Sequence, residues 1–385
     1  MTAAPLDDLL VIGAGLAGIG AATAAARRGY AVTLISAHDR HPPDFRGEKL
    51  GEAQMATLER LGLGDAARQH TTPFDGCWQV RRGRITGMVS EREYSSNYSD
   101  LVNGLMAAIP APVRRITGRV ADLATGPHHQ AVTLADGRVY TGRLLVIATG
   151  LSEAILKLAG LERQTISAGH SVACGYDIEE PAADFRFPSL VWGPGPTHPR
   201  LSYLTLFPIG GRMRGNLFTY HTVGDPWTRL FRDDPETAVR EAVPELEASF
   251  GRMTIRPGAV ARPIDLKSLR NTRRHGVVAL GDAFSVVCPT TGYGMGKALT
   301  DADRLVNLYL PLWLATPGME ESKLAAFYAD PIKTALDARA MAESVSGRKF
   351  NLDPAPYWRV RRLSHAARQR LSVLTSPAVA ARPAA

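Results

Sequence analysis

The amino-acid sequence predicts an α/β fold with a parallel sheet, an inserted and mainly antiparallel β-sheet, and helices toward its C-terminal end. Two observations predict the parallel sheet: the apolar runs Leu9–Ile12 and Val277–Leu280 each end in a glycine-rich turn, and the turns lie 268 residues apart. A third observation predicts the inserted sheet, because residues 77–96 and 166–259 contain short apolar runs separated by Gly and Pro.

The first turn has the spacing of a dinucleotide-binding site. Gly13 permits a tight turn, Gly15 leaves room for a pyrophosphate, and Gly18 lets the next helix pack against the strand. The helix from Leu16 onward has an amino end that favours an anion, and residues 31–35 complete a Rossmann-like βαβ unit. An ordinary strand-to-helix turn is the alternative. The candidate residues here are Gly13, Ala14, Gly15, Leu16, Ala17 and Gly18.

The second strand of this unit ends where an acidic residue is expected to hold the ribose of adenosine. Ser36 occupies that position, and a serine can hydrogen-bond a hydroxyl only without charge assistance. Asp39 is the nearest acid downstream. We therefore expect the adenosine part of the dinucleotide to be bound more weakly.

The second turn places an acid at the carboxyl end of a strand, where open α/β sheets bind their ligands. Gly281 and Asp282 follow the strand, and the segment Pro289–Gly296 then opens a helix predicted to run to about Leu310. The amino end of that helix would point backbone amides at an electron-rich group. The two turns together predict the two halves of one flavin site.

With these motifs the chain resembles the FAD-dependent monooxygenases of the para-hydroxybenzoate hydroxylase type, the group A flavoprotein hydroxylases. The resemblance rests on Gly13–Gly18, on Arg46-Gly47-Glu48 and on the run from Gly281 to Ala302, and covers about residues 9–65 and 140–305. It implies FAD, bound by a domain of the GR2 type. It also implies that Asp282 binds the ribitol chain, that Gly294 and Met295 hold the flavin ring, and that Arg46 lies near the pyrophosphate. The full set of candidate cofactor-binding residues is Gly13, Ala14, Gly15, Leu16, Ala17, Gly18, Ser36, Arg46, Val120, Thr149, Gly150, Gly281, Asp282, Pro289, Gly292, Gly294 and Met295.

The chain departs from the family at two places. A family motif, Asp-Gly-x-x-Ser-x-x-Arg, is replaced after the strand Leu144–Ile147: Thr149 stands for the Asp, Glu153 for the Ser and Leu156 for the Arg. This motif has been linked to both FAD and nicotinamide contacts, so its loss argues against direct use of NADPH. NADPH or NADH and a separate flavin reductase are therefore both kept as candidate sources of electrons. Tyr98 stands where the family often has an Arg.

Composition narrows the class of protein. The 385 residues carry 45 Lys and Arg against 37 Asp and Glu, a net charge of +8, which indicates a basic surface or attraction of an acidic substrate or carrier protein. The basic residues are scattered without a nucleic-acid motif, which argues against nucleic acid. The three cysteines are widely spaced, so we expect no metal site, free thiols and a reducing, cytoplasmic location. No signal peptide or membrane span is predicted.

We expect the FAD-binding domain to be discontinuous, with residues 1–76, 97–165 and 260–325, and the substrate domain to comprise residues 77–96 and 166–259, including a helix over 238–250. Residues 326–385 form a C-terminal helical region with a disordered Ala/Pro tail. A helix from Trp358 to Leu374 carries five arginines, and either packs with a solvated basic face or contacts a membrane or partner.

The resemblance implies a monooxygenase that inserts one oxygen atom, by hydroxylation or epoxidation through a flavin C4a-hydroperoxide, into an aromatic or polyketide-like molecule of secondary metabolism. The alternatives are a flavin-dependent reductase of alkene bonds, similar to geranylgeranyl reductases, or a non-enzymatic FAD-binding protein. A flavin-dependent halogenase is disfavoured, because no two of the five tryptophans lie two positions apart. No catalytic residue and no oligomeric state are assigned; Tyr203, Arg214, His221 and Tyr293 are candidates that are each better explained as structural.

Overall fold

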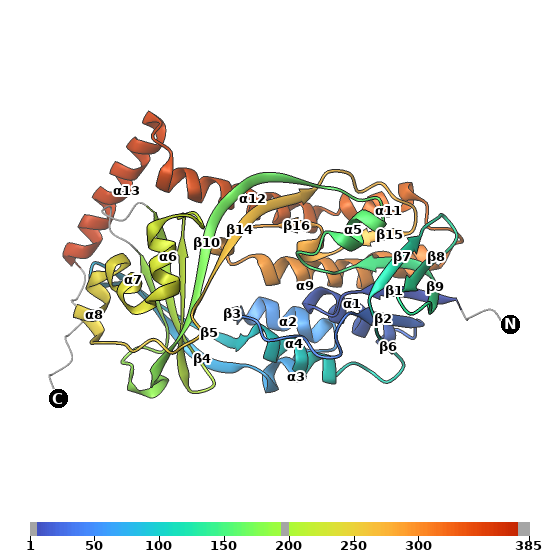
Figure 1. Cartoon of the computed structure of the whole chain (residues 1–385), viewed down its shortest axis with the longest axis horizontal. Coiled ribbons are helices and arrows are strands. Elements are labelled where there is room, and N and C mark those ends of the chain that lie inside the picture. Colours follow the sequence, from blue (N-terminus) through green and yellow to red (C-terminus); the bar gives the residue numbers. More distant parts are fainter. Residues whose placement is uncertain (1–5, 194–199, 376–385) are drawn as a thin grey trace.

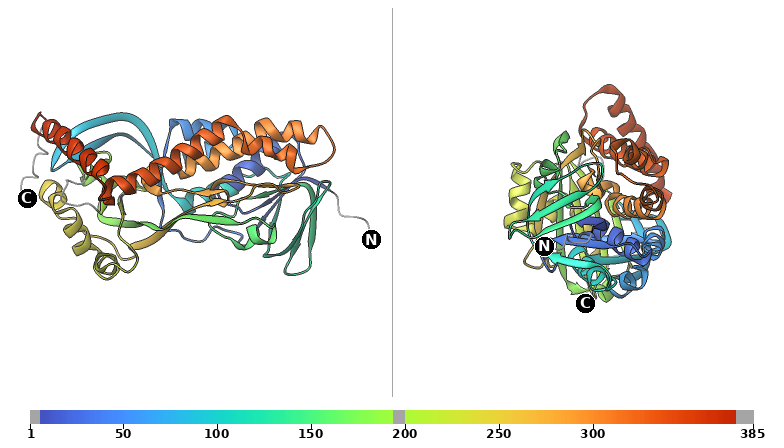
Figure 2. Two further views of the ribbon diagram at one scale, coloured as in Figure 1. Left: turned by 90° about the horizontal axis from the view of Figure 1, so that it is seen from above. Right: turned by 90° about the vertical axis from the view of Figure 1, so that its right-hand side faces the viewer.

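The computed structural model describes residues 6–193 and 200–375. Two β-sheets lie one beyond the other along the long axis of the molecule, and helices run along one side of both (Figures 1 and 2). The expected Ala/Pro tail after residue 375 lies outside the described residues.

The first sheet contains the βαβ unit that the sequence predicts. Strands β6, β2, β1, β9 and β15 are parallel in this order, and β7 and β8 extend β9 as an antiparallel meander. Because β1 and β15 both pair with β9, their carboxyl ends, each followed by a glycine turn, meet at one edge of the sheet. The strands are β1 (Asp7–Ile12), β2 (Val32–Ser36), β6 (Arg114–Thr117), β7 (Val120–Ala124), β8 (Gln130–Leu134), β9 (Val139–Ile147) and β15 (Val277–Ala279).

Helices cover one face of this sheet and bury its largest apolar cluster. α1 is rich in Ala and Gly and packs closely against α9, because small side chains let two helices approach. The helices of this half are α1 (Leu16–Arg27), α2 (Glu52–Arg60), α3 (Gly64–Gln69), α4 (Tyr98–Ala107) and α9 (Gly294–Arg304), with the short α5 (Ala154–Leu158) on the opposite face.

The second sheet has the strand order β16-β14-β10-β13-β12-β11-β4-β5-β3, and is antiparallel except between β11 and β4. The long strands β10 and β14 continue from this sheet toward the first one (Figure 1). The strands are β3 (Gly47–Gly51), β4 (Thr72–Arg81), β5 (Arg84–Asn97), β10 (Arg163–Pro181), β11 (Leu190–Gly193), β12 (Leu201–Ile209), β13 (Arg212–Thr219), β14 (Val260–Leu269) and β16 (Ser285–Val286).

Three short helices cover the outer face of the second sheet: α6 (Pro226–Asp233), α7 (Pro235–Ala242) and α8 (Pro244–Phe250). Each begins with a proline, which suits a first turn whose amide needs no partner. The single helix predicted over 238–250 is therefore wrong, because Pro244 cannot continue α7 and starts α8 instead.

The last helices tie the two halves together. α9 continues as a π-helical stretch (Leu305–Tyr309) into α10 (Leu310–Leu314), and α11 (Glu321–Tyr328) follows. α12 (Pro331–Leu352) packs on α9 and runs toward the second sheet, where α13 (Pro356–Thr375) turns away at the end of the molecule (Figure 2). In the described part of the chain, every helix is too short or too polar to cross a membrane.

Candidate cofactor and active site

The glycines of the first turn have distinct packing roles. Gly13 has φ +108°, and a Cβ there would lie 2.4 Å from the carbonyl oxygen of Ala148, while a Cβ on Gly18 would collide with the carbonyl of Gly13. A Cβ on Gly15 would meet only the Tyr98 hydroxyl, at 3.2 Å. Gly13 and Gly18 are thus required by the fold, whereas Gly15 keeps open the space beside the helix amino end.

Tyr98 closes this space from the side of α4. The backbone N–H of Leu16, at the first position of α1, donates to the Tyr98 hydroxyl at 3.2 Å. The Arg46 guanidinium lies 3.7 Å from the centre of the Tyr98 ring and is held by Asp44 through bonds of 2.9 and 2.6 Å. The Arg46 guanidinium therefore places a positive charge beside the amino end of α1, although α4 carries Tyr98 where the family often has an Arg.

The second turn lies directly against the first. A Cβ on Gly281 would be 3.7 Å from the Cβ of Ala17 and 3.3 Å from that of Ala298. The Gly281 N–H donates to Asp301 at 2.8 Å, which fixes the turn that carries Asp282. The fold thus joins the two motifs that are 268 residues apart in the sequence.

Two carboxyl groups share this region with Arg46. Burial raises the pKa of Asp282, whereas Arg46, Lys297 and Arg163 lower it. Burial also raises the pKa of Glu48 to about 7; the Asp282 and Asp44 carboxylates add to this rise, and Arg46 and Arg214 oppose it. A carboxyl group whose pKa lies near neutrality, as at Glu48, can donate as well as accept hydrogen bonds, which suits a site that must hold hydroxyl groups.

The loop before α9 leaves its backbone open. Pro289–Thr291 form one 3₁₀ turn, Gly292 has φ +68°, and a Cβ on Gly294 would have no neighbour within 4 Å. The Tyr203 hydroxyl of β12 donates to the Thr290 carbonyl at 2.9 Å and so holds this loop to the second sheet. The amino end of α9 is therefore available for a planar group with excess electron density.

A third turn joins the same place. Among the described residues the buried Thr149 hydroxyl has no hydrogen-bond partner, and a Cβ on Gly13 would lie 3.0 Å from the Thr149 N–H. The Arg163 guanidinium donates to the carbonyls of Gly150 and Asp282 and so links this turn to the second one. An orphan hydroxyl and the uncovered backbones at Gly15 and Gly294 fit a large polar cofactor such as FAD.

The adenosine end is built differently from the family pattern. The Ser36 hydroxyl donates to the carbonyl of His38 at 2.8 Å, and Asp39 lies 3.8 Å from Arg115. A cavity of about 500 Å³ lies beside Asp39 and is also lined by Arg115, Asn103 and neighbouring residues. Val120, at the start of β7, pairs with Leu134.

The second sheet turns one face toward the loop that precedes α9. Arg262, Ala173, Phe218 and Tyr203 lie side by side across β14, β10, β13 and β12, and the Tyr203 hydroxyl reaches that loop. Antiparallel partners directly opposite one another point to the same face, so this row faces the loop.

The residues beside this row hold the chain around Arg46. Asn216 donates to the carbonyl of Gly47 at 2.8 Å, and the buried Arg214 donates to the carbonyl of Phe45 and to Asp177. Arg214 is therefore a structural residue that fixes this stretch.

The two other candidates lie in different places. His221 stacks on Trp227 at 4.8 Å and pairs with Asp225 where α6 begins, and these contacts do not connect it to the glycine turns. Tyr293 lies in the loop before α9, between Gly292 and Gly294, and its hydroxyl donates to Glu343 of α12 at 3.2 Å.

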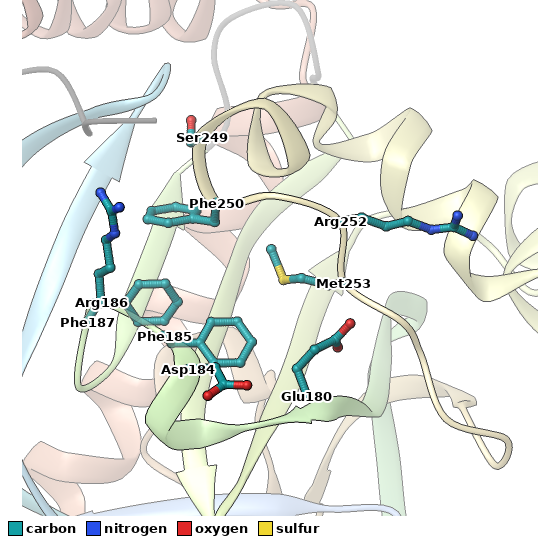
Figure 3. A pocket seen from close by; sticks show the side chains of 9 residues that line it. All are labelled: Glu180, Asp184, Phe185, Arg186, Phe187, Ser249, Phe250, Arg252 and Met253. Carbon is teal, nitrogen blue, oxygen red and sulfur yellow. The ribbon is translucent and has the colours of Figure 1, made fainter. Parts of the chain in front are cut away.

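A different pocket lies on the outer face of the second sheet (Figure 3). It is lined by the aromatic rings of Phe185, Phe187 and Phe250 together with Met253, and its volume of about 20 Å³ holds about one water molecule. It is a gap in the packing of α8 against the sheet, not a ligand site.

Sequence reasoning missed three contributors to the site. Arg163 lies in a long strand and belongs to no motif. Lys333 lies in a C-terminal helix, also outside any motif, and donates to Asp301, the residue that holds the second turn. The role of Tyr98 as an acceptor from Leu16 was also missed, because only the fold shows that α4 begins beside α1.

Comparison with known proteins supports this geometry. Residues 7–132 match the model of a family described as FAD binding domain. The chain is 22% identical over 352 residues to the 3-demethoxyubiquinol 3-hydroxylase of Escherichia coli, and this alignment covers 82% of this chain and 84% of that protein.

Solved structures have the same fold over nearly the whole chain. One is p-nitrophenol 4-monooxygenase from Pseudomonas putida, with a TM-score of 0.74, 13% identity, and coverage of 94% of this chain and 93% of the other. Another is HpxO of Klebsiella pneumoniae complexed with FAD and uric acid, with a TM-score of 0.69, 17% identity, and coverage of 96% and 97%.

These matches confirm the predicted fold class and the prediction of FAD as the cofactor. The family match runs from β1 into β8 and includes the first glycine turn, and the solved structures extend the likeness over nearly the whole chain. Residues 7–132 therefore form an FAD-binding domain, and over most of its length the chain is similar to FAD-dependent monooxygenases of the para-hydroxybenzoate hydroxylase type.

Proposed function

We propose that this monooxygenase hydroxylates or epoxidises a planar organic molecule of aromatic or polyketide-like character. The observation that carries the proposal is that the row formed by Arg262, Ala173, Phe218 and Tyr203 lies opposite the open amino end of α9. Aromatic side chains on a rigid sheet suit a flat substrate, because they offer large contact area and a fixed orientation. The oxygen chemistry is supplied by the FAD when it is bound.

The protein's own residues bind and orient the cofactor in this proposal. The amides at the start of α1 and the Arg46 guanidinium hold the pyrophosphate. The Asp282 carboxyl and the Thr149 hydroxyl, which has no other partner among the described residues, hold the ribitol hydroxyls. The amino end of α9, at Gly294 and Met295, stabilises negative charge on the flavin ring. Ser36 and Val120 border the adenine side, and Pro289 and Gly292 shape the loop beside the ring.

The electron donor is NADPH or NADH, or a separate flavin reductase. The second option is supported by the altered third turn, where Glu153 forms an ion pair with Lys267 at 2.9 Å and Leu156 is buried. Neither side chain is then available in the way that the family motif requires. Further partners that we propose are an acidic carrier protein or a membrane surface, which the net charge of +8 would attract.

We also propose the domain division of residues 1–76, 97–165 and 260–325 for FAD, 77–96 and 166–259 for substrate, and 326–385 as a helical region. The separate apolar clusters of the two sheets support this division. Strands β3 and β14 belong by sequence to the ranges proposed for FAD, but they pair within the second sheet. A cytoplasmic location is supported by three free, buried cysteine thiols.

The test begins with the visible spectrum of the purified protein after incubation with FAD. NADH and NADPH are then added separately without oxygen, followed by a chemically reduced flavin, and candidate aromatic substrates are supplied with ¹⁸O₂. Product that carries one ¹⁸O atom supports the proposal, and bleaching by only the reduced flavin assigns a separate reductase. Product that gains two hydrogens and no oxygen would instead assign the protein as a reductase of alkene bonds. Absence of bound flavin would overturn it.

A further inference from the structure

The positive charge of the chain is concentrated at its C-terminal end. Residues 354–385 contain six arginines and no acidic residue, whereas the whole chain has a net charge of only +8. The arginines are Arg359, Arg361, Arg362, Arg368, Arg370 and Arg382. The remainder of the chain is therefore close to electrically balanced, and an anionic partner would be drawn to this segment.

The inward face of α13 is fixed to the body of the protein. Arg362 donates to the carbonyls of Phe350 and Asp353, each at 2.8 Å, and so satisfies the last carbonyls of α12. Phe350 also meets the His365 ring edge-on at 5.3 Å. Because these contacts anchor one side of α13, the opposite side has a defined orientation toward solvent.

That outward side is apolar. Tyr357, Val360 and Leu363 follow one another at intervals of three residues and are 61%, 64% and 71% exposed. Residues at this spacing lie along one side of a helix. Three exposed side chains of this size in one row, here called the α13 stripe, leave apolar surface in water and indicate a surface that is covered in use.

Arginines flank the α13 stripe. Arg361 lies against Tyr357, with an N–H bonded to its hydroxyl at 3.2 Å, and Arg359 and Arg368 are exposed beside it. Within the described ranges none of the three forms an ion pair with an acidic side chain. An apolar row between unpaired arginines matches the boundary of a lipid layer, where apolar side chains enter the acyl region and guanidinium groups reach the anionic headgroups.

We propose that α13 docks the protein on an anionic lipid surface through the α13 stripe and its flanking arginines. An acidic protein would pair with the arginines but would also need an apolar groove for the stripe. A lipid surface meets both needs without shape complementarity. Docking there would bring a membrane-dissolved substrate close to the second sheet, against whose end α13 packs.

The test uses the full-length protein loaded with FAD and sedimented with vesicles. One set contains phosphatidylcholine alone and the other also contains phosphatidylglycerol. We expect binding to the anionic vesicles to be about tenfold tighter or more, and to weaken between about 0.1 M and 0.5 M salt. The pair Val360→Asp and Leu363→Asp should abolish it, and Arg361→Gln with Arg368→Gln should remove the preference for anionic lipid.

Leu312→Asp is the matched control, because Leu312 is 63% exposed on α10 and lies outside the α13 stripe. Val360→Asp alone provides the same test if the double variant does not fold, which the flavin spectrum reports. Equal binding to both kinds of vesicle, or to neither, would overturn the proposal. So would a dimer in size-exclusion chromatography that Val360→Asp dissociates, since the α13 stripe would then join two copies of the chain.

Discussion

Lys333→Met should remove a buried charge that links α12 to the second glycine turn. The Lys333 ammonium donates to Asp301 and to Asp337, each at 2.9 Å. Asp301 in turn accepts the Gly281 N–H, and Asp337 also pairs with Lys297 of α9. The two lysines balance the two aspartates, and Lys333, Lys297 and Asp301 are each no more than 2% exposed.

The expected magnitude follows from this burial. Methionine fills nearly the same space but leaves two carboxylates facing one ammonium, and an uncompensated buried charge costs about 3–5 kcal/mol of unfolding free energy. Burial lowers the pKa of Lys333 below its ordinary value although Asp301 raises it, so the ion pair offsets only part of the lost solvation. FAD affinity should fall as well, because Asp301 holds the turn that carries Asp282.

The assay is urea unfolding of the protein without FAD, together with titration of FAD. Arg304→Met is the matched control: it breaks another contact between α9 and the start of α12, where Asp330 keeps bonds from Tyr309 and from the backbone of Ile332 and Lys333. We expect it to cost less than Lys333→Met and to leave FAD affinity unchanged. A loss below about 1 kcal/mol for Lys333→Met, or equal effects of both variants on FAD, would refute the reasoning.

Three further predictions concern the two turns and the nearby Glu48. Asp282→Ala should reduce FAD retention sharply while Asp282→Asn keeps part of it, and full flavin occupancy in the alanine variant would contradict the assignment. Gly15→Val should block FAD and leave the protein without FAD near its normal stability, since only the Tyr98 hydroxyl is nearby; Gly13→Ala should instead lower stability, because its Cβ meets the Ala148 carbonyl. Glu48 has a folded pKa of about 7, above its ordinary 4.5, so it favours the folded state at low pH and this contribution is lost as pH rises from about 4.5 to 7. Glu48→Gln should therefore gain stability relative to the natural protein across that window, by at most ~3 kcal/mol in thermal or urea unfolding, and a difference independent of pH would count against it.

Local patterns along the chain were sufficient to predict the parallel sheet and both turns. The run Leu9–Ile12 with Gly13, Gly15 and Gly18 specifies a strand, a turn and a helix through interactions between near neighbours. The prediction of a single helix over 238–250 was wrong for a local reason too, because the backbone restriction at Pro244 interrupts the helix despite its helical periodicity. FAD contacts of the individual residues stay predictions.

By itself, then, the sequence determined the glycine turns, the acid after the second of them, and FAD as the cofactor. Only the tertiary structure decided that Tyr98 accepts from Leu16, that Arg163 bridges Gly150 and Asp282, and that Lys333 supports the second turn. Glycine turns are specified by backbone conformation within a few residues, so they leave a readable pattern. Contacts between residues 80 or more positions apart, such as Leu16 with Tyr98 and Arg163 with Asp282, depend on how the sheets and helices pack, and no local spacing records them.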